Sequence, residues 1–150
     1  MASLHSLFAL SGTWTGTSRL WMSPSAPMRE SSSVATITPV VRGRFVRIDY
    51  SWAIDGEAQE GMLLFGRDAK DLVTGIWIDS WHMGDRFMIC RGTAGGAAIS
   101  VRGSYAAPSG PDWGWRIDVE PGDGFRLVMY NLPPGGKEEL AVEATYTKTP

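Results

Sequence analysis

Apolar and polar residues alternate along most of this chain, in short segments that end at Gly, Pro and Asp. Over residues 113–120 the Trp and aliphatic residues take every second position, and residues 139–148 alternate in the same way. This period of two is typical of β-strands with one buried and one solvated side. The predicted inward residues are Trp113, Trp115, Ile117 and Val119 in the first segment, and Leu140, Val142, Ala144 and Tyr146 in the second.

Turn-forming residues divide the chain into about ten such segments. The predicted strands are 12–21, 29–38, 44–54, 59–67, 72–82, 86–92, 98–106, 113–120, 125–132 and 139–148. The intervals between them are too short for helical crossovers, so consecutive strands should pair antiparallel. A twisted sheet of this size tends to close, because closure removes its unpaired edges. We therefore predict an all-β fold: residues 1–150 form one domain, a single closed antiparallel up-and-down β-barrel.

The first ten residues have a different period. Leu4, Leu7 and Phe8 are three and four positions apart, which is typical of a helical turn with one apolar side. We expect a short N-terminal helical turn that covers one end of the barrel. A signal peptide is not expected, because the segment has no basic start and no long apolar stretch.

Two turns predict how neighbouring strands pair. Asp55-Gly56 favours a two-residue hairpin turn. This turn sets Ile54 opposite Glu57, Tyr50 opposite Gly61, Ile48 opposite Leu63 and Val46 opposite Phe65. A second turn at residues 83–85 would set Trp81 opposite Phe87 and Asp79 opposite Ile89, with Arg91 diagonal to Asp79.

The second register predicts charged groups inside the barrel. It assigns Trp77, Trp81, Phe87 and Ile89 to the interior, and Asp79 and Arg91 accompany them. A buried unpaired charge costs several kcal/mol, about 3 to 5 when a partner is missing. Asp79 and Arg91 should therefore pair with each other, or meet water or a ligand in the lumen.

Composition and charge narrow the classes of function. The net charge is -2 and no basic stripe is present, so nucleic acid is not an expected partner. No apolar run approaches the roughly 20 residues that a membrane-spanning helix needs. Cys90 is the only cysteine, so no internal disulfide can form, which favours a reducing compartment. We expect a cytoplasmic protein.

Candidate catalytic and metal-binding residues do not converge. Asp79, Ser80 and His82 resemble parts of a nucleophilic triad, but Asp79 and His82 point to opposite sides of an extended strand. The two histidines, Cys90 and the scattered carboxylates lack the spacing of metal ligands. We expect His82 at the surface or rim and Cys90 as a small apolar core residue opposite Ile78. No catalytic residue, metal or cofactor is predicted.

The aromatic residues favour a ligand in the lumen. Several of the seven Trp fall on predicted inward faces, where they can fill a packed core or line a cavity. Barrels of eight or more strands can leave room inside. We predict binding of a small, largely apolar or amphipathic molecule without turnover. The predicted ligand-binding residues are Tyr50, Trp52, Trp77, Asp79, Trp81, Arg91, Tyr105, Trp115 and Met129.

Two alternatives of other classes remain open. An enzyme could work in the same cavity with Asp79 as general acid or base, since aromatic walls raise the pKa of a carboxyl group. A homodimer could form through Met62 and Leu64 on an outer strand face.

Several motifs together resemble a known family. Gly12-Thr13-Trp14 resembles the Gly-x-Trp element of the calycin superfamily, where the Trp packs across the barrel bottom. The wider pattern is similar to an uncharacterised bacterial lipocalin-like family of unknown function and implies a single barrel with no established activity. Nitrobindins begin similarly but bind haem through a late-strand histidine, and this chain has none after His82. The motifs are Leu10-Ser11-Gly12-Thr13-Trp14-Thr15-Gly16, Gly43-Arg44-Phe45, Glu60-Gly61, Leu64-Phe65-Gly66, Trp77-Ile78-Asp79-Ser80 and Ala144-Thr145-Tyr146-Thr147-Lys148.

Overall fold

The computed structural model describes residues 4–68, 72–95 and 98–149, and within them a short helix and ten strands. The helix α1 spans His5–Phe8. The strands are β1 Gly12–Leu20, β2 Arg29–Val40, β3 Phe45–Ile54, β4 Glu57–Arg67, β5 Val73–Asp79, β6 Met88–Gly95, β7 Ala98–Tyr105, β8 Trp113–Pro121, β9 Phe125–Leu132 and β10 Glu139–Lys148.

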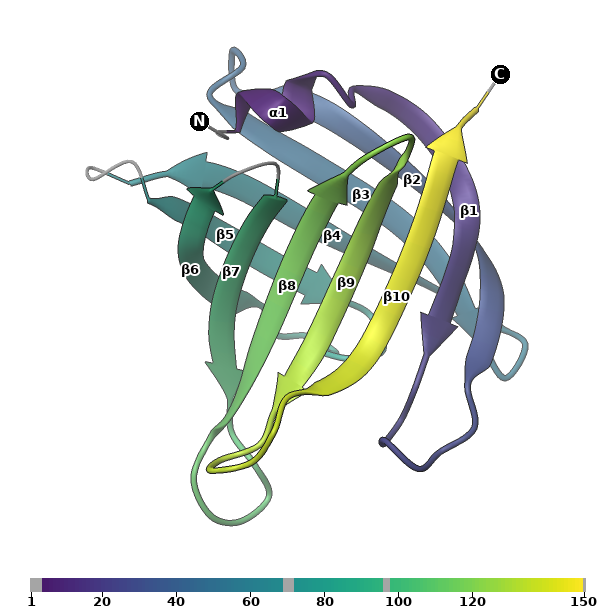
Figure 1. The fold of residues 1–150 in the computed structure, drawn as a ribbon, viewed down its shortest axis with the longest axis vertical. Coiled ribbons are helices and arrows are strands. Elements are labelled where there is room, and N and C mark those ends of the chain that lie inside the picture. Colours follow the sequence, from purple (N-terminus) through teal and green to yellow (C-terminus); the bar gives the residue numbers. More distant parts are fainter. Residues whose placement is uncertain (1–3, 69–71, 96–97, 150) are drawn as a thin grey trace.

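The ten strands form one closed antiparallel barrel. Each strand pairs with the next along the chain, and β10 pairs with β1 to close the sheet (Figure 1). This up-and-down order confirms the predicted fold class, and it is consistent with a calycin-like fold. The inward apolar residues of all ten strands form one core, as expected when alternation puts one side of every strand in the lumen.

The helix α1 closes one end of the barrel (Figure 1). Leu4, Leu7 and Leu10 are buried there. Trp14, at the start of β1, donates its indole N–H to the Leu10 carbonyl oxygen at 2.7 Å and meets the ring of Phe125 edge-on. This end is therefore capped by apolar contacts, as the sequence predicts. No helix among the described residues has the length and apolar content that spanning a membrane requires.

The β3–β4 hairpin has the predicted register. Tyr50 lies opposite Gly61 and Ile48 opposite Leu63, and the pairing continues to Ile54 and Glu57 at the turn. Asp55 and Gly56 both have positive φ, 51° and 78°, as a tight hairpin turn with left-handed central residues requires. Local turn chemistry is enough to fix the pairing here.

The predicted β5–β6 register is wrong. It implies Arg91 opposite Trp77, whereas Met88 occupies that position. The shift of three residues is odd, so every side chain of β6 changes sides. Met88 and Cys90 are buried, while Phe87 and Ile89 are 53% and 51% exposed. The register differs because β5 ends at Asp79, and residues 80–87 form a loop instead of extending the strands.

One predicted inward residue of β10, Leu140, is wrong because the strand contains a β-bulge. The register shifts between Leu140 and Val142, so the inward position passes from Leu140 to the buried Ala141. An extra residue in one strand interrupts alternation in this way. Val142, Ala144 and Tyr146 point inward as predicted, and so do Trp115, Ile117 and Val119 of β8.

Candidate functional site

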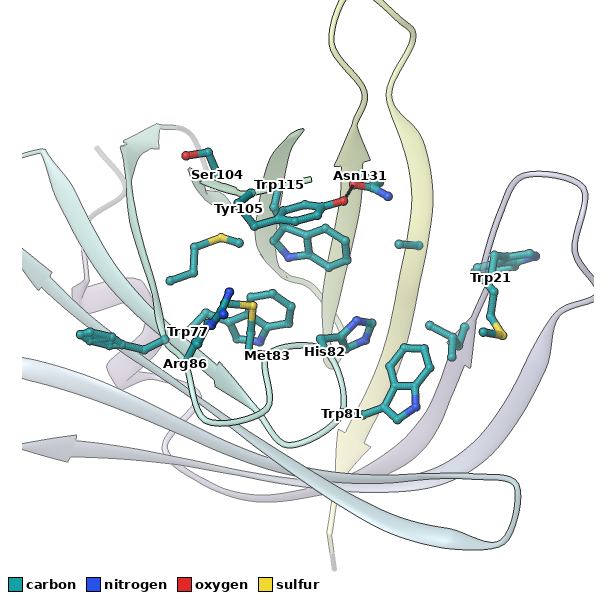
Figure 2. Close-up of a pocket in the computed structure, with 16 residues that line it drawn as sticks. Trp21, Trp77, Trp81, His82, Met83, Arg86, Ser104, Tyr105, Trp115 and Asn131 are labelled. Atoms are coloured by element: carbon teal, nitrogen blue, oxygen red, sulfur yellow. Dashed lines mark hydrogen bonds between the residues drawn. The ribbon is translucent and has the colours of Figure 1, made fainter. Parts of the chain in front are cut away.

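A cavity of about 540 Å³ lies at the barrel end opposite α1. This volume is within the range of small-molecule sites, roughly 300–1,000 Å³. Figure 2 shows the side chains that surround it. They come from the end of β1 and the loop after it, from β5, from the 80–87 loop, and from strands β6 to β10 with the loop after β7. The lining residues are Leu20, Trp21, Met22, Trp77, Trp81, His82, Met83, Arg86, Phe87, Met88, Ser104, Tyr105, Ala106, Trp115, Asn131 and Ala141.

The lumen below this cavity is filled. A second space, between Asp79, Tyr50 and Tyr146, measures only about 10 Å³. That is close to the minimum that a single water molecule needs. The buried Tyr146 hydroxyl, 2.7 Å from the Ser33 hydroxyl, shares a hydrogen bond with it, and burial raises the Tyr146 pKa to about 12. In the part of the chain that the structure describes, side chains thus nearly fill the lumen beneath the cavity, and the larger space lies at the open end.

The Asp79 carboxylate fastens the 80–87 loop to the barrel. Its Oδ1 accepts the backbone N–H groups of Trp81 and His82, both at 2.9 Å. Its Oδ2 accepts the Tyr50 hydroxyl at 2.7 Å and the Trp52 indole N–H at 3.2 Å. Asp79 is only 1% exposed. Four donors therefore stabilise a carboxylate that meets no cation among the described residues.

The Tyr50 hydroxyl reaches Asp79 because Gly61 lies between them. Tyr50, Gly61 and Asp79 are in register on β3, β4 and β5. A Cβ on Gly61 would overlap the Tyr50 ring and hydroxyl. The Trp77 indole N–H also donates to the Tyr50 oxygen, at 2.9 Å. Burial and the nearby Asp79 hold the pKa of Tyr50 well above its ordinary value, so Tyr50 remains a donor.

Indole rings surround the His82 imidazole at the base of the cavity. The ring stacks on Trp52 at 5.5 Å and meets Trp81 edge-on at 4.8 Å. Trp77 and Trp115 lie 5.5 Å from it on other sides and stack on each other at 5.1 Å. Within the described residues, neither ring nitrogen has a hydrogen-bond partner. Burial lowers the His82 pKa, and the nearby Asp79 charge opposes that shift only in part.

The remaining polar groups of the cavity are mainly donors. The Tyr105 hydroxyl donates to Asn131 Oδ1 at 2.6 Å, which leaves the Asn131 amide N–H groups available (Figure 2). The Trp115 indole N–H is buried without an acceptor in the described structure. Arg86 points toward the cavity beside Met83 and Trp77 (Figure 2). Among the described residues that line the cavity there is no Asp or Glu.

Comparison with known protein families gives a match over nearly the whole chain. A family model described as a protein of unknown function, DUF1579, matches residues 2–148. The chain belongs to the DUF1579 family. No curated protein matches it.

The predicted ligand-binding residues of this DUF1579 protein fall into three groups. Trp77, Trp81, Tyr105 and Trp115 line the larger cavity. Tyr50, Trp52, Asp79 and Met129 line the small space beneath it and support the cavity floor. Arg91 is not in the lumen: it is exposed on the outer face of β6, opposite Thr74 and Arg102.

The predicted pairing of Arg91 with Asp79 is therefore wrong, and the β5–β6 register is the reason. The alternative that Asp79 is a general acid or base stays a prediction, although all its hydrogen bonds hold protein groups and its carboxyl does not line the larger cavity. Met62 and Leu64 are half-buried on the outer face of β4, beside Ile78 and Ile76.

Sequence reasoning missed four polar residues of the cavity, one of which is Ser104 of β7. His82 is not an outward rim residue, because the chain turns after Asp79 and carries the imidazole under the indoles. Arg86 belongs to the same loop, and Asn131 lies at the end of β9. The pattern Asp-Ser-Trp-His was the available signal for a turn, since an Asp side chain can accept N–H groups two and three residues later.

Groups that could hold a metal do not gather in the described residues, where no cluster of three or more His, Cys, Asp or Glu is found. Cys90 lies opposite Gly75, not Ile78, and points inward. Burial raises the pKa of its thiol to about 11. The thiol is therefore protonated near neutral pH and has little nucleophilic character.

His82 should make the stability of the barrel depend on pH. Its pKa in the folded protein is below the ordinary value of 6.5, so the unfolded chain binds the proton more readily. The stabilisation is present above pH 6.5 and is lost as the pH falls below that value, at no more than about 1.4 kcal/mol per pH unit for one proton. Urea unfolding between about pH 7 and pH 5 should show a shallower decline for His82→Phe, which keeps an aromatic ring without titration. Equal slopes for the two proteins would refute this.

Proposed function

We propose that this DUF1579 protein binds a small, largely apolar molecule at the open end of its barrel and does not transform it. The observation that carries the proposal is the single-ended lumen: a 540 Å³ cavity above a filled barrel base. Its wall combines indoles and methionines with a few polar groups, the usual composition of a small-molecule site. A lipocalin-like role as a carrier or sensor of such a molecule fits this arrangement.

The construction of the cavity floor supports binding. Hydrogen bonds to Asp79 hold the loop that carries Trp81 and His82, so these rings are positioned before a ligand arrives. A preorganised site loses less conformational entropy on binding. The buried Trp115 N–H without an acceptor is a further sign, because unsatisfied buried donors are rare in protein interiors.

Phenylnaphthylamine, an uncharged dye that fluoresces in apolar surroundings, tests the proposal. We expect its emission to rise on addition of the protein and to saturate at one dye per chain. Ala106→Trp should weaken binding at least about tenfold, because the new indole would occupy cavity space. Ala58→Trp is the control, since Ala58 is exposed on β4 and does not line the cavity.

Two results would contradict the proposal. One is an unchanged emission with the natural chain. The other is equal dye affinity in Ala106→Trp and Ala58→Trp, which would place the dye outside the barrel mouth. Circular dichroism of both variants shows whether they keep the fold.

A further inference from the structure

We propose that the ligand is an amphipathic anion, whose apolar body lies among the indoles and whose acidic group is held at Arg86. This inference rests on the proposed function and adds the chemical class of the ligand. It comes from the charge and hydrogen-bonding character of the groups around the cavity.

Arg86 is the one Arg or Lys among the described residues that line the cavity, and no described residue forms an ion pair with it. No ion pair or side-chain hydrogen bond of Arg86 is found within the described part of the chain, and no carboxylate lines the cavity there. Arg29 differs in this respect, because it pairs with Asp55 at 2.8 Å. A guanidinium beside an apolar wall binds carboxylate or sulfonate groups through paired N–H donors.

The neutral polar groups favour the same kind of ligand. The Asn131 amide offers N–H donors because Tyr105 already uses its oxygen. Neutral His82 can donate one hydrogen bond and accept another, and its lowered pKa keeps it neutral near pH 7. Donors therefore outnumber acceptors around the cavity, and a ligand head that only accepts hydrogen bonds matches them.

Asp79 does not reverse this preference. Its carboxylate lies beneath the loop and lines the small space, not the larger cavity. Each of its two oxygens accepts two hydrogen bonds, and these four bonds stabilise the negative charge locally. Arg86 would repel a cationic ligand, and none of the described lining residues is a carboxylate that could pair with it.

Two dyes with the same ring system test the inference. Anilinonaphthalene sulfonate carries one negative charge, and phenylnaphthylamine is its uncharged counterpart. We expect the sulfonate to bind at least about tenfold more tightly, and added NaCl to weaken only the sulfonate. Arg86→Met should remove this preference, because it should weaken the binding of the sulfonate much more than that of the uncharged dye. Decanoate should displace phenylnaphthylamine at lower concentration than decanamide does.

Arg91→Met is the matched control, because it removes an exposed arginine from the outer face of β6 without changing the cavity. It should keep the affinities for both dyes. If phenylnaphthylamine binds and the sulfonate shows no advantage, or if Arg86→Met keeps the advantage, the anion inference is overturned while the proposed function stands. If neither dye binds in the cavity, both proposals fail.

Discussion

Replacing Asp79 by Leu is expected to lower the free energy of unfolding by about 3 to 5 kcal/mol, the largest effect we anticipate for a single substitution. The change removes the acceptor of four hydrogen bonds at once. The Tyr50 hydroxyl and the Trp52 indole N–H would then be buried without their acceptor. The backbone N–H groups of Trp81 and His82 would also lose theirs, so the 80–87 loop would no longer be held to the barrel through Asp79. Urea denaturation followed by Trp fluorescence measures the loss.

Two further variants separate the role of Asp79 from a general effect of charge. Asp79→Asn keeps one acceptor oxygen for the loop, so it should destabilise less than the Leu variant. Asp49→Asn removes a half-exposed carboxylate whose partner is Arg47, and it should change stability by less than about 0.5 kcal/mol. An Asp79→Leu protein as stable as the Asp49→Asn protein would show that the loop does not depend on this carboxylate.

Replacing Gly61 by Val should cost about 2 to 4 kcal/mol, although the site is in a regular strand that favours β-branched residues. The added side chain would overlap the Tyr50 ring and hydroxyl. Tyr50 would have to move, and its hydrogen bonds with Asp79 and Trp77 would break. Chemical denaturation gives the stability, and near-ultraviolet circular dichroism reports the altered packing of the indoles.

A second glycine and a double variant test the steric explanation. A Cβ added at Gly122 would meet no atom within 4 Å, so Gly122→Val should be nearly neutral. Tyr50→Ala removes the ring that the new valine side chain would strike, so the double variant should lose less stability than the sum of the single variants. Strict additivity would mean that Gly61 matters for a reason other than Tyr50.

The cavity could be predicted only in part. The aromatic residues Trp77, Trp115 and Tyr105 are inward because their strands alternate regularly, and that pattern is local. Arg91 was placed wrongly because its side depends on how many residues the β5–β6 connection uses. His82 was treated as a rim residue for the same reason. Because the β5–β6 connection was predicted wrongly, the predicted site contained Arg91, which is on the outer face, and lacked Arg86 and His82, which line the cavity.

The sequence by itself determined the ten strands, their antiparallel order and the β3–β4 register, because alternation and an Asp-Gly turn act between near neighbours. Only the tertiary structure decided where β5 stops and which end of the barrel stays open. Asp79 ends its strand by accepting hydrogen bonds from the following loop and from Tyr50 and Trp52 of β3, which lie far away in the chain. Whether the lumen is filled likewise depends on how inward side chains from all the strands pack against one another. These residues are far apart in the chain, so no local sequence pattern predicts their packing.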